Sequence, residues 1–202
     1  MNKDYSVMKA IIEADYTRRV KTFRALPMEG KNVIIGDSLI AYFNLNHYNL
    51  NHWVNMGVAG DTTVGVRKRL DAVIRLEPPK VILSIGSNNL VLTDLTVEES
   101  VKEIILLYQE LSRHTSIYVL SITPVNETIK KANHLYIADR SNQEIQMMNR
   151  KLSEVLKDRL IDVSTPLLDE SGLLCEELTT DGIHLNHEGY LILIKTLENI
   201  LF

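Results

Sequence analysis

The sequence has few of the features that mark extracellular, membrane-bound or multidomain proteins. Cys175 is the only cysteine among 202 residues, so no disulfide can form within the chain. No apolar run approaches the roughly 20 residues that cross a membrane, and the first residues lack the apolar core of a signal peptide. There is no internal repeat and no linker rich in Gly, Ser and Pro. We therefore expect one cytoplasmic domain, residues 1–202, without membrane insertion.

The sequence also lacks a surplus of basic residues. Lys and Arg number 22 against 26 Asp and Glu, which gives a net charge of −4 at pH 7. No basic run with interleaved aromatic residues is present, so we expect no nucleic-acid partner. The hydrophobic content of 45% is ordinary for a globular protein with a substantial core.

Short apolar runs alternate along the chain with longer stretches of helical periodicity. The expected strands are 33–35, 52–55, 81–85, 117–122 and 160–163, and the expected helices are 8–26, 63–74, 96–113, 139–157 and 186–201. This alternation predicts an α/β fold with a parallel sheet of about five strands, covered on both faces. We expect the helical N-terminal segment, residues 1–30, to pack on this domain; contact with a second copy in a homo-oligomer is the alternative.

Three polar loops directly follow predicted strands, and a fourth polar segment lies near the end of the chain. These segments are Gly36-Asp37-Ser38, Gly57-Val58-Ala59-Gly60-Asp61, Gly86-Ser87-Asn88-Asn89 and Asp181-Gly182-Ile183-His184. The carboxyl ends of parallel strands share one edge of a sheet, where open α/β folds bind ligands. We therefore expect the first three loops to converge at that edge.

The residue types in these segments suit acyl transfer. A serine hydroxyl becomes nucleophilic when a base takes its proton, and Ser38 with His184 could form such a pair. Asp181 could orient the imidazole and stabilise its charged form. The oxyanion of a tetrahedral intermediate needs fixed donors, for which the backbone N–H groups of Ser38 and Gly60 and the side-chain amide of Asn88 are candidates.

These four segments resemble, in the same order, the sequence blocks of the SGNH (GDSL) hydrolases, and they extend over 32–190. The resemblance implies a flavodoxin-like three-layer α/β/α sandwich and an esterase or lipase active on a small-molecule ester, without metal or organic cofactor. By similarity, Ser38 is the nucleophile, His184 the base and Asp181 its orienter, with Ser38, Gly60 and Asn88 as oxyanion donors. Asn89 stands where many members have Asp, a variant similar to the branch of platelet-activating-factor acetylhydrolases. We expect Asn89 to hydrogen-bond its own loop.

Two other classes of function remain open from the residues alone. A catalytically silent binding protein could keep the fold and the pocket while Ser38 serves only as a turn or helix-cap residue. A metal-dependent hydrolase could use Asp181, His184 and His187 as oxygen and nitrogen ligands, although a fourth ligand is missing from the pattern. A silent binding protein predicts that a serine-directed organophosphonate leaves Ser38 unmodified. A metal-dependent hydrolase predicts activity that is lost in a strong chelator and kept after Ser38→Ala.

Overall fold

The computed structural model describes residues 6–27 and 30–202, so residues 1–5 and 28–29 of the expected N-terminal segment lie outside it. The strands are β1 (Asn32–Gly36), β2 (Trp53–Gly57), β3 (Lys80–Ser84), β4 (Ser116–Leu120) and β5 (Leu160–Ile161). The α-helices are α1 (Ser6–Arg24), α2 (Ser38–Ala41), α3 (Thr63–Arg67), α4 (Leu70–Ile74), α5 (Asn89–Leu92), α6 (Val97–Ser112), α7 (His134–Ile137), α8 (Asn142–Leu156), α9 (His187–Thr196) and α10 (Glu198–Leu201). Short 3-10 helices occupy Lys157–Arg159, Thr165–Leu167 and Glu176–Leu178.

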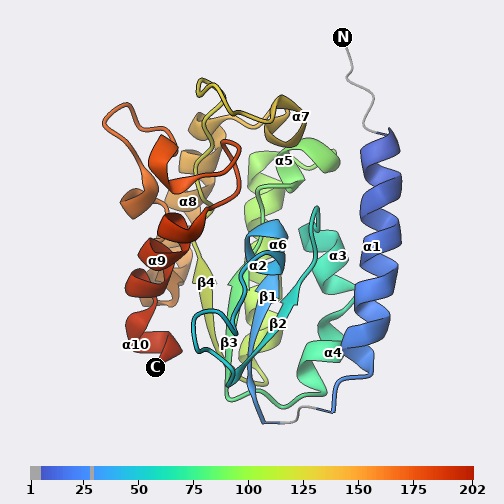
Figure 1. Cartoon of the computed structure of the whole chain (residues 1–202). Coiled ribbons are helices and arrows are strands. Elements are labelled where there is room, and N and C mark those ends of the chain that lie inside the picture. Colours follow the sequence, from blue (N-terminus) through green and yellow to red (C-terminus); the bar gives the residue numbers. More distant parts are fainter. Residues whose placement is uncertain (1–5, 28–29) are drawn as a thin grey trace.

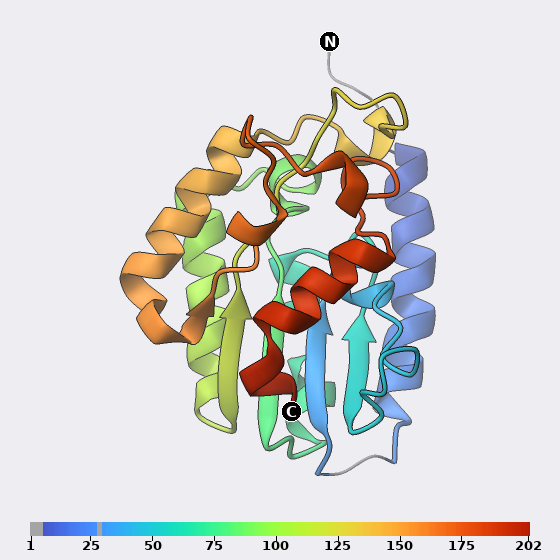
Figure 2. The same ribbon diagram turned by 60° about the vertical axis from the view of Figure 1, so that its left-hand side comes forward.

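The five strands form one parallel sheet in the order β2-β1-β3-β4-β5, which is the flavodoxin-like order. Helices cover both faces, as Figures 1 and 2 show. Successive strand residues point to opposite faces. Val33 and Ile35 therefore pack with α3, α4, α6 and α8, whereas Ile34 packs with α2, α9 and α10. The predicted α/β sandwich with about five strands is confirmed.

Several helix boundaries differ from those expected. The expected helix 63–74 is two helices, because Arg69 leaves the helical conformation at φ −126° and buries its side chain completely. The expected helix 139–157 begins only at Asn142, which leaves Arg140 in a loop. The final helix is interrupted at the buried Leu197, between α9 and α10.

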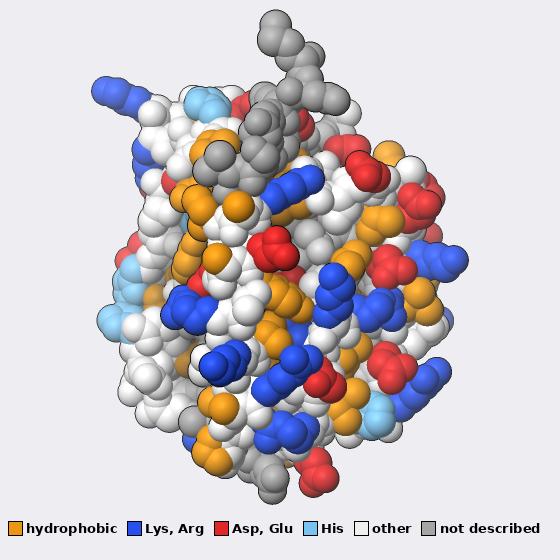
Figure 3. Space-filling view, turned by 90° about the vertical axis from the view of Figure 1, so that its right-hand side faces the viewer, with side chains coloured by type: hydrophobic (Ala, Val, Ile, Leu, Met, Phe, Trp, Pro, Cys, Tyr) orange, Lys and Arg blue, Asp and Glu red, His pale blue; other side chains and the backbone are white. Residues whose placement is uncertain are grey.

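Helix α1 packs beside α3 and α4, at the edge of the molecule nearest β2 (Figure 1). Val20 and Phe23 of this helix are buried, and Tyr16 donates its hydroxyl to the carbonyl of Gly65 at 2.8 Å. Arg19 donates to the carbonyl of Gly57 at the end of β2, at 3.0 Å. On the outer face of this side, basic and acidic side chains are interspersed with hydrophobic ones (Figure 3). Within the described residues, no helix is long and apolar enough to cross a membrane.

Candidate active site

The three loops after β1, β2 and β3 meet at the carboxyl edge of the sheet, because these strands are neighbours in the order β2-β1-β3. Asp37 and Ser38 follow β1, Gly60 follows β2, and Asn88 follows β3. The segment that precedes α9 supplies His184 to the same place, although it is 146 residues from Ser38 in sequence. The sheet therefore assembles side chains from four distant segments.

Ser38, His184 and Asp181 form one hydrogen-bonded series. The Ser38 Oγ lies 3.1 Å from His184 Nε2, and His184 Nδ1 lies 2.7 Å from Asp181 Oδ2. Partial burial alone would raise the pKa of Asp181, but hydrogen bonds from the ring and backbone N–H of His184 lower it. The carboxylate is therefore held ionised beside the imidazole. With a proton on Nδ1, the His184 ring can accept the Ser38 proton at Nε2.

Local backbone features hold both ends of this series. Asp37 caps α2 by accepting the backbone N–H of Leu39 at 3.1 Å, and burial raises the pKa of its carboxyl to about 7. Gly36 passes so close to β3 that an added Cβ would lie 2.1 Å from the carbonyl oxygen of Ser84. At the other end, Asp181 Oδ1 accepts the backbone N–H of His184 at 2.8 Å, which folds the segment back on itself.

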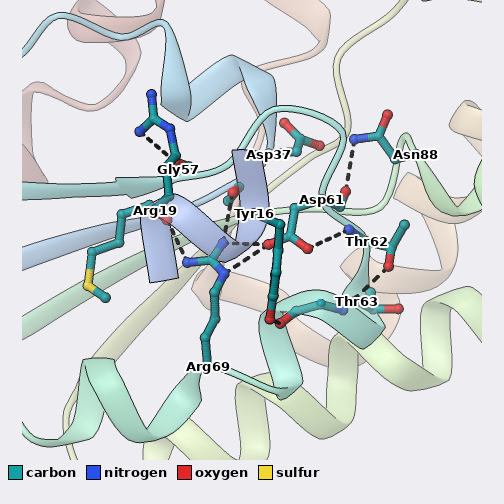
Figure 4. Close-up of polar contacts among 12 residues, drawn as sticks. Tyr16, Arg19, Asp37, Gly57, Asp61, Thr62, Thr63, Arg69 and Asn88 are labelled. Carbon is teal, nitrogen blue, oxygen red and sulfur yellow. Dashed lines mark hydrogen bonds and ion pairs between the residues drawn. The ribbon is translucent and has the colours of Figure 1, made fainter. Parts of the chain in front are cut away.

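The predicted oxyanion donors line the same cavity as Ser38 and His184. This cavity, of about 290 Å³, is bordered by Ser38, Gly60, Asn88 and His184. Gly60 adopts a positive φ of 76°, which favours glycine, and an added Cβ there would lie 2.5 Å from the side chain of Ile12. The amide of Asn88 donates from Nδ2 to the carbonyl of Asp61 at 2.8 Å (Figure 4).

Asn89 does not bond its own loop through its side chain, so that expectation is wrong. Its Oδ1 accepts the backbone N–H of Thr63 at 3.1 Å, and its Nδ2 donates to the hydroxyl of Thr63 at 2.8 Å. An amide can both accept and donate, whereas an ionised carboxylate can only accept. The Asn89 side chain thus joins the loop after β3 to the start of α3.

Arg69 joins the strand ends next to the site, a role that no sequence motif indicates. Its fully buried guanidinium pairs with Asp61 Oδ2 at 2.7 Å and also donates to the carbonyls of Met56 and Gly36, at 2.6 and 3.0 Å (Figure 4). Burial raises the pKa of the Asp61 carboxyl, and the Arg69 charge acts in the opposite direction. One side chain thus connects the ends of β1 and β2 with the Gly60 loop.

Two cavities of different size adjoin Ser38. The larger one, of about 290 Å³, has a mainly apolar and aromatic wall, formed by Ile11, Ile12, Tyr42, Leu92, Leu135 and Tyr136. The smaller one holds about 30 Å³ and is bordered by Leu39, Ser87, Ile122 and Ile183. The rings of Tyr42 and Tyr136 stand edge-on to the His184 ring, with centroids 5.0 and 5.6 Å away. Both cavities border Ser38 and His184, so a ligand bound at the Ser38 hydroxyl can extend into a small space and into a larger apolar one.

His187 does not join Asp181 and His184 in a metal site. It begins α9, where its Nδ1 lies 3.1 Å from the Tyr48 hydroxyl and its ring stands near that of His47. Among the residues that the structure describes, no three His, Cys, Asp or Glu side chains are grouped as metal ligands. The geometry of these residues thus gives no support to the hypothesis of a metal-dependent hydrolase.

Comparison with known proteins identifies the family. The family model for GDSL-like Lipase/Acylhydrolase matches residues 34–192. N-acylneuraminate cytidylyltransferase of Escherichia coli O18:K1:H7 is 27% identical over 177 residues, which is 83% of this chain but 39% of that protein. The chain thus spans about two fifths of the length of that relative. The alpha1 subunit of platelet-activating factor acetylhydrolase IB from Rattus norvegicus is 23% identical over 86% of this chain and 75% of its own length.

Solved structures agree with this assignment. A Streptococcus pneumonia protein described as a platelet activating factor has a TM-score of 0.85 and 28% identity, with 97% of each chain covered. A GDSL-like lipase from Bacteroides thetaiotaomicron has a TM-score of 0.80 at 19% identity, which shows a shared fold, and covers 93% of this chain and 97% of its own. The chain belongs to the GDSL-like lipase/acylhydrolase family.

Proposed function

We propose that the protein is a serine esterase that cleaves a small carboxylic ester through an acyl-serine intermediate. The observation that carries this proposal is the hydrogen-bonded series from Asp181 through His184 to Ser38, with contacts of 2.7 and 3.1 Å. The 3.1 Å contact is within the distance at which a base can take a hydroxyl proton, and the 2.7 Å contact orients that base.

In the first half of the proposed reaction, Ser38 Oγ attacks the carbonyl carbon while His184 Nε2 takes the hydroxyl proton. The carbonyl oxygen becomes an oxyanion, which accepts hydrogen bonds from the backbone N–H groups of Ser38 and Gly60 and from Asn88 Nδ2. His184 then returns the proton to the alcohol oxygen as its bond to carbon breaks. Asp181 stabilises the imidazolium throughout.

In the second half, water attacks the acyl-serine carbonyl and gives its proton to His184. The tetrahedral intermediate collapses, the carboxylic acid leaves, and Ser38 regains its proton from His184. No metal or organic cofactor takes part in either half of the proposed reaction.

The smaller cavity supports a short acyl group. It holds about 30 Å³, whereas a water molecule needs roughly 10–15 Å³ measured in the same way. An acetyl methyl group fits such a space and a long chain does not. The expected substrates are therefore acetyl or short-chain esters, with the alcohol portion in the cavity of about 290 Å³.

The test is hydrolysis of p-nitrophenyl esters from acetate to octanoate by the wild type, Ser38→Ala and the control Ser112→Ala. Ser112 is exposed at the end of α6, where its hydroxyl donates to the nearby carbonyl of Gln109. We expect kcat to fall by about a thousandfold or more in Ser38→Ala but not in Ser112→Ala. The activity of the wild type should decline as the acyl chain lengthens. Turnover that survives in Ser38→Ala would refute the proposal. Absence of turnover and of a Ser38 adduct with an organophosphonate would favour a binding protein.

A further inference from the structure

Arg140 reaches the active site from the loop between α7 and α8. Its Nε donates to the Ser87 hydroxyl at 2.9 Å, and its Nη1 donates to the carbonyl of the buried Ile137 at 2.9 Å. Its Nη2 donates to Asn88 Oδ1. The guanidinium is thus held by its own loop on one side and contacts two consecutive residues of the β3 loop on the other.

These contacts determine which way the Asn88 amide faces. An asparagine amide has one acceptor oxygen and two N–H donors. In the observed orientation, Asn88 Oδ1 accepts a hydrogen bond from the Arg140 guanidinium. One of the two N–H groups of Nδ2 donates to the carbonyl of Asp61 at 2.8 Å. A flipped amide would put its NH₂ group against the guanidinium and its oxygen against a carbonyl. Both pairs are repulsive, so the second N–H of Nδ2 has a fixed direction.

The charge of Arg140 also acts on the strength of that donor. Hydrogen bonds that involve an ionised partner are roughly twice as strong as neutral ones. A cation at Oδ1 draws electron density from the amide and so makes its N–H a better donor. Asn88 is buried, with 6% of its surface exposed, so solvent screens this effect little. The effect is greatest when the substrate oxygen carries a full negative charge.

We propose that Arg140 is a positioning residue that holds and polarises the Asn88 amide for the oxyanion of the transition state. This inference rests on the proposed esterase function. The positioning role differs from two simpler roles of Arg140. In one, Arg140 only stabilises the loop before α8; in the other, it contacts the bound substrate directly in the larger cavity, which Arg140 also lines. A positioning role predicts a loss in kcat that depends on the presence of Asn88.

The experiment compares Arg140→Met, Arg140→Lys, Asn88→Ala and the double variant Arg140→Met/Asn88→Ala with p-nitrophenyl acetate. Arg159→Met is the matched control, because its guanidinium lies over the Tyr118 ring and contacts Ser116, at the start of β4. Thermal unfolding of each variant reports whether the fold is kept.

We expect Arg140→Met to lower kcat by about ten- to a hundredfold with KM changed less than about threefold. Arg140→Lys should keep more activity than Arg140→Met, because a lysine ammonium can still donate to Asn88 Oδ1. Asn88→Ala should cost about a hundred- to a thousandfold, and the double variant should be no more than about threefold worse than Asn88→Ala.

Losses that multiply in the double variant would overturn the inference, because Arg140 would then act independently of Asn88. A rise in KM at constant kcat would instead indicate direct substrate binding and would also overturn it. If Ser38→Ala abolishes turnover while Arg140→Met behaves like the control, the inference fails and the esterase proposal stands. If Ser38→Ala keeps full turnover, both fail.

Discussion

Replacing Arg69 by methionine should destabilise the protein far more than replacing a surface arginine. The change would leave the Asp61 carboxylate buried without its cation and would remove the donor from the carbonyls of Met56 and Gly36. Removing one partner of a buried ion pair typically costs about 3–5 kcal/mol of unfolding free energy. Arg67→Met is the control, because its pair with Glu103 has the same 2.7 Å contact while the Arg67 side chain is 42% exposed. An exposed pair contributes about 1 kcal/mol at most.

Urea unfolding followed by circular dichroism at pH 7 measures the difference. With a slope of about 2 kcal/mol per molar urea, a loss of 4 kcal/mol lowers the midpoint by about 2 M. The control should shift by no more than about 0.5 M. Equal small shifts in the two variants would refute the reasoning that Arg69 compensates a buried charge.

The pH dependence of the stability of Arg69→Met tests whether the buried Asp61 charge causes the loss. Burial already raises the pKa of Asp61, and loss of Arg69 should raise it further. A carboxyl whose pKa is higher in the folded state favours folding at low pH, and this contribution is lost as pH rises toward the folded pKa. The deficit of Arg69→Met should therefore be smaller at pH 5 than at pH 8. A deficit that grows on acidification would contradict this explanation.

Two further predictions concern Asp37 and Ile12. Because burial raises the pKa of Asp37 from 3.8 to about 7, wild-type stability should fall as pH rises across that range. Asp37→Asn keeps an acceptor for Leu39, so its urea midpoints at pH 5 and pH 7.5 should differ less than those of the wild type. Ile12→Ala should widen the larger cavity and raise kcat/KM several-fold for acetates of bulky alcohols relative to ethyl acetate. Val155→Ala is the control, because Val155 is exposed on α8 and does not line that cavity. An unchanged ratio in Ile12→Ala would count against Ile12 as a wall of the cavity.

The apolar runs that predict the parallel strands also predict that the loops after these strands meet at one edge of the sheet. The run at 33–35 is apolar throughout and the run at 81–85 is apolar except for Ser84, as is typical of strands buried on both faces. Once these strands are parallel neighbours, the loops that carry Ser38 and Asn88 must lie at one edge. His184 could be assigned to that edge only through the family resemblance, because nothing in its local sequence fixes where its segment folds.

The two arginines beside the site could not be predicted, because their roles depend on distant partners. Arg69 lies in a stretch with regular helical periodicity, and nothing in that pattern shows that its side chain turns inward to the ends of β1 and β2. Arg140 was expected in the first turn of a helix. The spacing of Ser141 and Glu144, three residues apart, is typical of a helix start and would have placed Arg140 before it.

Helix α1 lies wholly outside the region that the family match covers, 34–192, and yet it supplies Ile11 and Ile12 to the wall of the larger cavity. A fragment trimmed to the matched region would keep Ser38, Asn88 and His184 but lose that wall. If the larger cavity holds the alcohol portion as proposed, related chains can share every reacting group and still select different alcohols, according to what each carries before its first strand. Under the proposed function, a change in this one leading helix can therefore alter selectivity while Ser38, Asn88 and His184 stay the same.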